Sequence, residues 1–153
     1  MKNSIKPQGC TNLKLRQLSR IVTRHYDHFF SEVGLKITQY SLLSHVVKLG
    51  PLRPVDLAKR MQMDASTLTR NLQPLAAMGF LTIGAGADAR SRLVIATEIG
   101  ASKQAQAQRA WKTAQLALNK QLGTERVAAL HELLDSCIEC LGGDKEGDDA
   151  KAD

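Results

Sequence analysis

The sequence predicts a mainly α-helical fold that carries one small β hairpin. Apolar residues recur at intervals of three and four through most of the 153-residue chain, which is the period of one helix face. Between residues 54 and 79, a tight link joins two short segments of helical pattern. Two short strand-like segments then flank a loop over residues 84–92 that contains Gly, Asp and Arg, a pattern typical of a hairpin.

The first predicted helix covers about residues 11–33 and ends at Gly34. Its opposite face is basic, and a solvated surface explains those charges as well as a functional one does. A second helix is predicted from Thr38, as its cap, to Leu49, before Gly50-Pro51. The apolar face of the first helix consists of Leu15, Leu18, Val22, Tyr26, Phe29 and Val33, and its basic face of Lys14, Arg16, Arg20, Arg24 and His25.

The next two helices form a predicted helix-turn-helix. Residues 54–61 begin with Pro at the first helical position, and Gln62-Met63-Asp64 leads into a second helix that ends at Met78-Gly79. Asp64 is suited to cap that helix, whose interior Pro74 should loosen or bend its last turns. One face carries Leu68, Leu72 and Leu75, and short polar side chains and one Arg dominate the rest: Ser66, Thr67, Thr69, Arg70, Asn71 and Gln73.

A hairpin and two long helices complete the chain. Residues 80–83 and 93–97 read as strands around the 84–92 loop, and Glu98–Leu122 and Thr124–Leu141 read as helices. The last helix has a coiled-coil-like apolar seam. Because this apolar surface exceeds what the helix-turn-helix needs, we expect the first helix and the two terminal helices to form a symmetric dimer. The seam consists of Val127, Leu130, Leu134, Cys137 and Leu141.

At these residues the sequence resembles the MarR family of bacterial transcription regulators. The matching segments are Asp56-Leu57-Ala58, residues 66–70 (Ser-Thr-Leu-Thr-Arg), Asp88-Ala89-Arg90-Ser91 and residues 97–100 (Thr-Glu-Ile-Gly). The resemblance covers about residues 11–141. It implies a winged helix-turn-helix flanked by long dimerisation helices, with 1–10 a flexible N-terminus, 11–36 a dimerisation helix, 37–97 the DNA-binding domain, 98–141 dimerisation helices and 142–153 a disordered acidic tail.

The implied function is a DNA-binding regulator, usually a repressor, that binds a pseudo-palindromic operator in double-stranded DNA as a homodimer. The second helix of the motif would enter the major groove, and Arg90 at the hairpin tip the minor groove. Asp88 would orient Arg90 or the loop, and Arg92 would contact a phosphate. The predicted DNA-binding residues are Ser66, Thr67, Thr69, Arg70, Gln73, Asp88, Arg90 and Arg92.

Composition supports an anionic partner. The formal net charge is +6 and the sequence pI about 9.4. Residues 142–153 hold five acidic and two basic residues, a net charge of −3, so the preceding residues carry +9. Three cysteines, an absent signal peptide and the lack of a long apolar run favour the reducing cytoplasm and no membrane span.

Catalytic and metal chemistry find little support. Cys137 and Cys140 are spaced as a CxxC pair, but they lie at a helix end with no second ligand pair, so we expect them to pack in the core. Gly84-Ala-Gly86 precedes no helix and is not a nucleotide loop. With no Ser-His-Asp set and no carboxylate pair on a shared face, we expect neither an enzyme, nor a cofactor, nor a metal.

Two hypotheses address what releases the DNA. In the first, a small anionic aromatic compound binds between the dimerising helices and the DNA-binding lobe, as the resemblance implies for phenolic acids. Arg16 or Arg20 would meet its carboxylate, and Tyr26, Tyr40 and His45 would pack its ring.

In the second hypothesis, Cys10 at the start of the first helix is oxidised by organic hydroperoxides, as in some proteins of the family. A different class also stays open, in which the fold is a non-regulatory architectural DNA-binding protein or a protein-interaction module.

Overall fold

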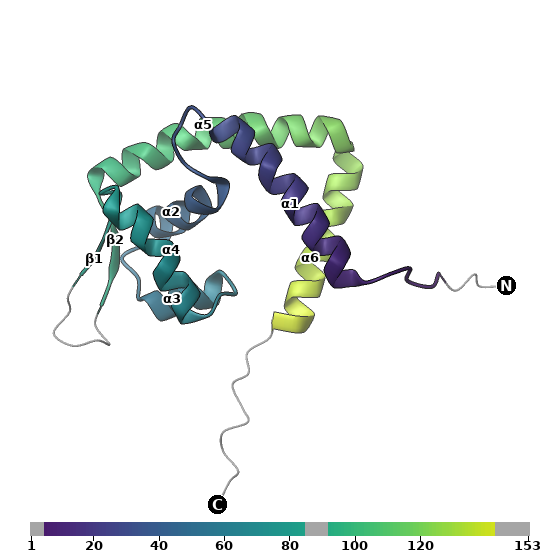
Figure 1. Cartoon of the computed structure of the whole chain (residues 1–153), viewed down its shortest axis with the longest axis horizontal. Helices are drawn as coiled ribbons and strands as arrows, with labels where there is room; N and C mark the ends of the chain where they lie inside the picture. Colours follow the sequence, from purple (N-terminus) through teal and green to yellow (C-terminus); the bar gives the residue numbers. More distant parts are fainter. Residues whose placement is uncertain (1–4, 85–91, 143–153) are drawn as a thin grey trace, which may run out of the picture.

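The computed structural model describes residues 5–84 and 92–142. The described elements are, in chain order (Figure 1), α1 (Thr11–Phe30), α2 (Ile37–Leu49), α3 (Pro54–Arg60), α4 (Ala65–Ala77), β1 (Leu81–Ile83), β2 (Val94–Ala96), α5 (Glu98–Leu122) and α6 (Thr124–Gly142). The prediction of a mainly α-helical chain with one small hairpin is therefore confirmed.

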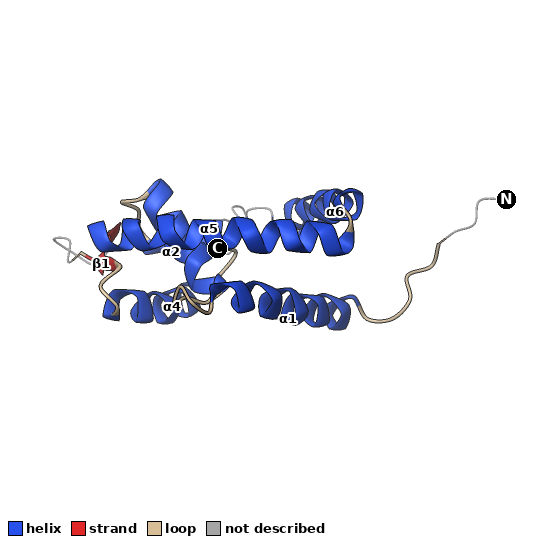
Figure 2. Cartoon of the chain, turned by 90° about the horizontal axis from the view of Figure 1, so that it is seen from above, coloured by secondary structure: helices blue, strands red, loops and turns tan. Residues whose placement is uncertain are grey.

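The long helix α5 connects the helix-turn-helix and its hairpin to α1 and α6. Figure 1 shows it running from the hairpin, past α2, to the turn into α6. Helices α1, α2 and α6 all contact α5, and Figure 2 shows α1 extending alongside it. Thr97 begins α5, because its side-chain oxygen accepts the Gly100 N–H at 3.0 Å and its hydroxyl donates to the Gly79 carbonyl at 2.6 Å. The same residue thus ties α5 to the end of α4.

The core around the helix-turn-helix is a set of fully buried aliphatic and aromatic side chains. Pro at the first position of α3 and Asp64 before α4 set the starts of these helices. Packing of α2, α3, α4 and the hairpin then excludes water from one face of each. The largest fully buried residues are Phe30, Leu43, Val46, Leu57, Leu68, Leu72, Leu75, Leu81 and Val94.

The hairpin is antiparallel and is anchored at its base. Leu81 pairs with Ala96, and Ile83 pairs with Val94. Leu52, between α2 and α3, exchanges backbone hydrogen bonds with Val94 at 2.8 and 3.3 Å. This bridge covers one edge of β2 and fixes the hairpin to the lobe. The described base of the hairpin is therefore anchored.

Two predicted helix boundaries are wrong. α1 ends at Phe30, not Val33, because Ser31 and Val33 bond back in tight turns before Gly34 at φ +77°. α2 starts at Ile37, so Thr38 is not its cap. The Asp27 carboxylate on α1 instead accepts the Ile37 N–H at 2.8 Å. A side chain distant in sequence thus satisfies this helix end.

Helix α6 leaves much of its apolar surface uncovered. Val127 is buried, but Leu133 and Leu141 are 65% and 88% exposed. The prediction that Cys137 and Cys140 pack in the core is wrong for the single chain, because both are exposed free thiols. The contacts of α6 come mainly from α5, so one chain supplies too few partners for its seam. None of the helices within residues 5–84 and 92–142 has the length and apolar character of a membrane span.

Gly100 is a strict packing requirement. A Cβ at this position would lie 1.8 Å from the Phe80 carbonyl oxygen. Although Gly→Ala within a helix is normally stabilising, we expect Gly100→Ala to lower the free energy of unfolding by about 1–3 kcal/mol, because backbone must move. Thermal or urea denaturation tests this. Ser102→Ala, at an exposed position of the same helix, is the control and should leave stability nearly unchanged; an equally stable Gly100→Ala variant would contradict the close approach.

Candidate nucleic-acid interface

Helix α4 presents one buried and one open face. Leu68, Leu72 and Leu75 are no more than 1% exposed, which fixes the rotation of the helix about its axis. The predicted DNA-contacting residues of α4 all reach solvent: Ser66, Thr69, Arg70 and Gln73 are exposed, and Thr67 is half-buried. The structure therefore brings the five predicted residues of α4 to its accessible surface. The helix continues past Pro74 to Ala77.

Asp64 organises the first turn of α4. Its Oδ1 accepts the Thr67 N–H at 2.7 Å and the Ser66 hydroxyl at 2.9 Å. These bonds, first the backbone one and then those from the hydroxyls of Ser66 and Thr67, lower the pKa of the Asp64 carboxyl. The ionised carboxylate also suits the positive end of the helix dipole. The predicted N-cap is confirmed.

Internal hydrogen bonds limit what the polar residues of α4 can offer a ligand. The Ser66 hydroxyl donates to Asp64, and the Thr69 hydroxyl donates to the Ala65 carbonyl at 2.8 Å. In this arrangement both oxygens present lone pairs outward. Thr67 Oγ1 accepts a long hydrogen bond of 3.4 Å from Arg70. Because phosphates only accept, the side-chain donors that α4 can offer them include the remaining N–H groups of Arg70 and the amide N–H groups of Gln73.

The hairpin tip is only partly described. Arg92 is exposed just before β2. Asp88 and Arg90 lie outside the described residues. At the start of α3, Arg53 and Asp56 form an exposed bidentate pair at 2.8 and 3.1 Å, which lowers the pKa of Asp56. An exposed pair of this kind adds little stability, but it directs the Arg53 guanidinium toward α3.

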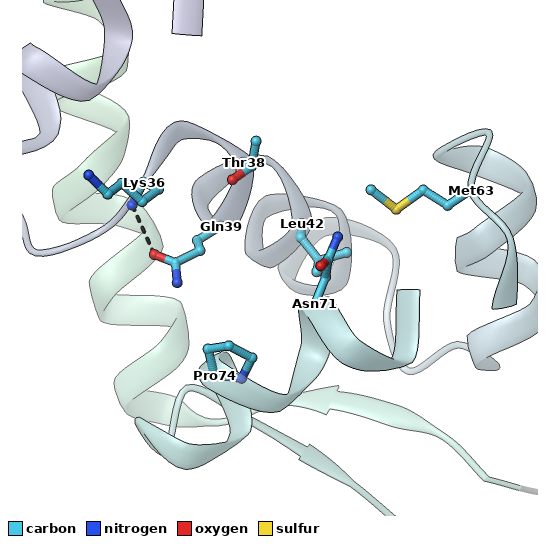
Figure 3. A pocket seen from close by; sticks show the side chains of 7 residues that line it. All are labelled: Lys36, Thr38, Gln39, Leu42, Met63, Asn71 and Pro74. Atoms are coloured by element: carbon cyan, nitrogen blue, oxygen red, sulfur yellow. Dashed lines mark hydrogen bonds between the residues drawn. The ribbon is translucent and has the colours of Figure 1, made fainter. Parts of the chain in front are cut away.

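A groove of about 260 Å³ separates the other flank of α4 from the start of α2. Figure 3 shows side chains from both helices and from the turn before α4 along this groove. Gln39 is held there by the bond from the Lys36 backbone N–H to its Oε1, at 2.9 Å. Asn71 thus faces α2, unlike the predicted DNA-contacting residues. The lining consists of Lys36, Thr38, Gln39, Leu42, Met63, Asn71 and Pro74.

A second pocket, of about 340 Å³, lies between α1, α2 and α5. It brings together Tyr26, Tyr40 and His45, three of the five residues predicted to bind an effector. Burial raises the pKa of Tyr26, whose hydroxyl donates to Gln115 on α5. His45 Nδ1 lies 2.7 Å from the Ser41 carbonyl, so Nδ1 carries the proton and Nε2 is left available.

The structure does not place Arg16 and Arg20 in that pocket. Both are exposed and line an open hollow on α1 with Leu15 and Ser19. At 1.5 Å per residue, Arg20 lies about 9 Å and Arg16 about 15 Å along the helix from Tyr26. The cation that does line the pocket is Lys48.

Sequence reasoning missed Lys48, Gln108 and Trp111 as pocket residues. Lys48 follows His45 by three residues, so helical spacing alone could have placed it on the same face. Gln108 and Trp111 come from α5, and no local signal connects them to α2. His25, assigned to the basic face, instead bonds through Nε2 to the Ala114 carbonyl of α5 at 2.8 Å.

Cys10 occupies the N-cap position of α1 as an exposed free thiol. Its carbonyl accepts the Lys14 N–H at 3.1 Å, so Lys14 lies one helical turn beyond Cys10. Among the described residues, no group of three or more His, Cys, Asp or Glu side chains could hold a metal ion.

Comparisons with known proteins agree on one family. A model described as MarR family matches residues 33–91. The uncharacterized HTH-type transcriptional regulator YwoH of Bacillus subtilis (strain 168) is 25% identical over 85 residues, which are 56% of this chain and 62% of that protein. The chain thus spans less than two thirds of the curated relative that it matches.

Solved structures of similar fold include complexes with DNA. The Mycobacterium tuberculosis transcriptional regulator MosR in complex with DNA is 28% identical, with a TM-score of 0.69 over 84% of this chain and 98% of that one. A mutant of Escherichia coli MarR complexed with operator DNA is 24% identical, with a TM-score of 0.74 over 83% and 92% of the two chains. At 24% identity, the similarity to the MarR mutant shows a shared fold alone.

We expect Asp64→Ala to lower the melting temperature at pH 7, because the first turn of α4 loses its acceptor. The folded-state pKa of Asp64 lies below its ordinary value of 3.8. Its stabilisation is therefore full above that value and is lost as pH falls through the lower folded-state pKa. Thermal melts of both proteins between pH 7 and pH 2 should converge at the acidic end. Asp64→Ser, which keeps an N-cap acceptor, is the control; a pH-independent gap would contradict a role for the ionised carboxylate.

Proposed function

Because the chain belongs to the MarR family of winged helix-turn-helix transcription regulators, we propose that it represses transcription by binding a specific operator in double-stranded DNA as a homodimer. The observation that carries this proposal is the geometry of α4. Its three buried leucines hold Arg70 and Gln73 outward on a helix that can enter the major groove. This activity would place the protein in the cytoplasm, with the chromosome.

On the operator, Arg70 and Gln73 supply hydrogen-bond donors to phosphates and base edges, while Ser66 and Thr69 accept from base amino groups. Thr67 lies at the start of the same surface. The hairpin, anchored by the Leu52 bridge, carries Arg90 toward the minor groove and Arg92 toward a phosphate. Asp88 orients the loop. In a two-fold dimer, half-sites then lie about ten base pairs apart, because recognition helices are about one turn of DNA apart.

The uncovered apolar surface supports dimerisation. Leu13, Ile21, Leu116 and Leu133 are each more than half exposed although they lie on α1, α5 and α6. An apolar cleft of about 240 Å³ separates these three helices. Monomers rarely leave large contiguous apolar surfaces in water. A second copy of the chain would bury them and would hold two α4 helices at a fixed spacing.

For release from DNA, we favour a small anionic aromatic effector in the pocket between α1, α2 and α5. Its carboxylate would meet Lys48, and its ring would pack against Tyr26, Tyr40 and Trp111, with His45 also lining the pocket beside the ring. The pocket joins α5, which belongs to the dimerising part, to α2, which supports α4. An effector that binds more tightly to one arrangement of α2 against α5 would favour that arrangement. The distance between the α4 helices of the two protomers would then change. Arg16 and Arg20 are not needed in this version.

Oxidation of Cys10 is the second candidate, and its exposure at a helix N-terminus favours it. A sulfenic acid formed there would change charge and hydrogen bonding beside the dimerising helices. The thiol lies far along α1 from the pocket of Tyr40, so the two mechanisms are separable by mutation.

We expect Arg90→Ala to weaken operator binding by about tenfold without changing the melting temperature, because the minor-groove contact is lost while the folded core is untouched. Fluorescence anisotropy with an operator selected from random DNA measures the affinity. Arg109→Ala, an exposed cation on α5, controls for net charge. Unchanged affinity of the Arg90 variant would contradict the assignment of the wing.

Titration of an aromatic carboxylate and of an organic hydroperoxide against the protein–operator complex separates the two mechanisms. We expect the carboxylate to release the DNA, and we expect His45→Ala or Lys48→Ala to raise the concentration needed by about tenfold or more. Cys10→Ser should behave as the wild type toward both compounds. Release by hydroperoxide in the wild type but not in Cys10→Ser would overturn effector binding in favour of the thiol.

A further inference from the structure

The described chain ends against the turn of the helix-turn-helix. Figure 1 shows that α6 turns back from the end of α5 toward the side of the molecule where α3 lies. A Cβ built on Gly142, the last residue of α6, would lie 3.1 Å from both polar atoms of the Gln62 side-chain amide. Gln62 precedes the cap Asp64 by two residues and has φ +53°. The described chain therefore ends beside the turn that precedes α4.

The charges of the two segments are complementary. Residues 143–153 contain five acidic and two basic residues, a net charge of −3. Residues 53–77, which include α3 and α4, contain four basic and two acidic residues, a net charge of +2. Of those acidic residues, Asp56 is paired with Arg53 and Asp64 caps α4. The exposed cations Arg60 and Arg70 lie on the two helices that flank Gln62.

The length of the acidic segment matches this surface. Eleven residues extend at most about 36–40 Å, whereas α4, with 13 residues, is about 20 Å long at 1.5 Å per residue. Starting beside Gln62, the acidic segment can reach every exposed position of α4. It needs no second chain and no rearrangement of the described helices.

We propose that residues 143–153 dock on the basic, exposed face of α3 and α4 and compete there with DNA. Their carboxylates take the place of phosphate oxygens opposite Arg60 and Arg70. Because the segment is tethered, its local concentration is of the order of millimolar, so even a weak contact is populated. The competition weakens binding to random DNA, where backbone charge supplies nearly all of the affinity. The affinity for the operator depends more on base contacts. The acidic segment lowers that affinity by the same factor, but operator binding is much tighter to begin with.

This inference rests on the proposed function for the identity of the competitor, so its test has one readout with DNA and one without. The tail variant carries Asp144→Asn, Asp148→Asn and Asp149→Asn. The matched control carries Glu32→Gln, Glu125→Gln and Glu132→Gln, three exposed carboxylates away from Gln62 that add the same charge. Anisotropy with a random 30-base-pair duplex at about 0.1 M salt gives the affinity. Amide NMR spectra of the full-length free proteins give the docking contact.

We expect the tail variant to bind random duplex about threefold to tenfold more tightly than the wild type, and the control to stay within about twofold. The amide signals of Gln62 to Gln73 should shift in the tail variant alone. Equal gains in both variants would overturn the proposal, because net charge would explain them. Unchanged amide signals would overturn it whatever the affinities. Shifted signals in a protein that binds no duplex would support the docking contact and overturn the proposed function instead.

Discussion

The structure depends on the requirement that α4 be held from one side only. A helix that enters a DNA groove must keep most of its circumference free, so most of its tertiary stabilisation comes from a narrow apolar stripe. Leu68, Leu72 and Leu75 form that stripe and are essentially inaccessible to water. Burial of each leucine contributes about 1.5–3 kcal/mol. The partners of the stripe, α2, α3 and the hairpin, are arranged around this burial.

The two ends of α4 are fixed by polar contacts that complement the apolar stripe. At the first turn, the Asp64 carboxylate accepts the Thr67 N–H. At the other end, the Thr97 hydroxyl at the start of α5 donates to the Gly79 carbonyl. The second contact has a structural consequence beyond capping. It joins the end of α4 directly to the start of α5 through one hydrogen bond. The position of α4 is thereby fixed relative to α5.

Local patterns in the sequence predicted the elements, the cap at Asp64 and the leucine face of α4, because each depends on residues within about one turn of helix. They failed where the deciding partner is distant in the chain. Asp27 caps α2 from α1, and His25 bonds to the backbone of α5, so the start of α2 and the role of the histidine were misassigned. The pocket was recovered only in part, since Trp111 joins Tyr40 through tertiary packing.

The hydroxyl side chains of α4 show why a list of polar residues does not define a reading surface. Ser66, Thr69 and Arg70 are all predicted DNA contacts, but the hydroxyl protons of the first two are directed to Asp64 and to the Ala65 carbonyl. Redirecting such a proton to a phosphate would break the hydrogen bond that it makes within the protein. Acceptors face outward at these two positions and donors face outward at Arg70 and Gln73. A surface of this mixed kind can pair with groups that offer both donors and acceptors, and it presents few cations. The choice of ligand at this face is therefore limited by the same hydrogen bonds that hold the first turn of the helix.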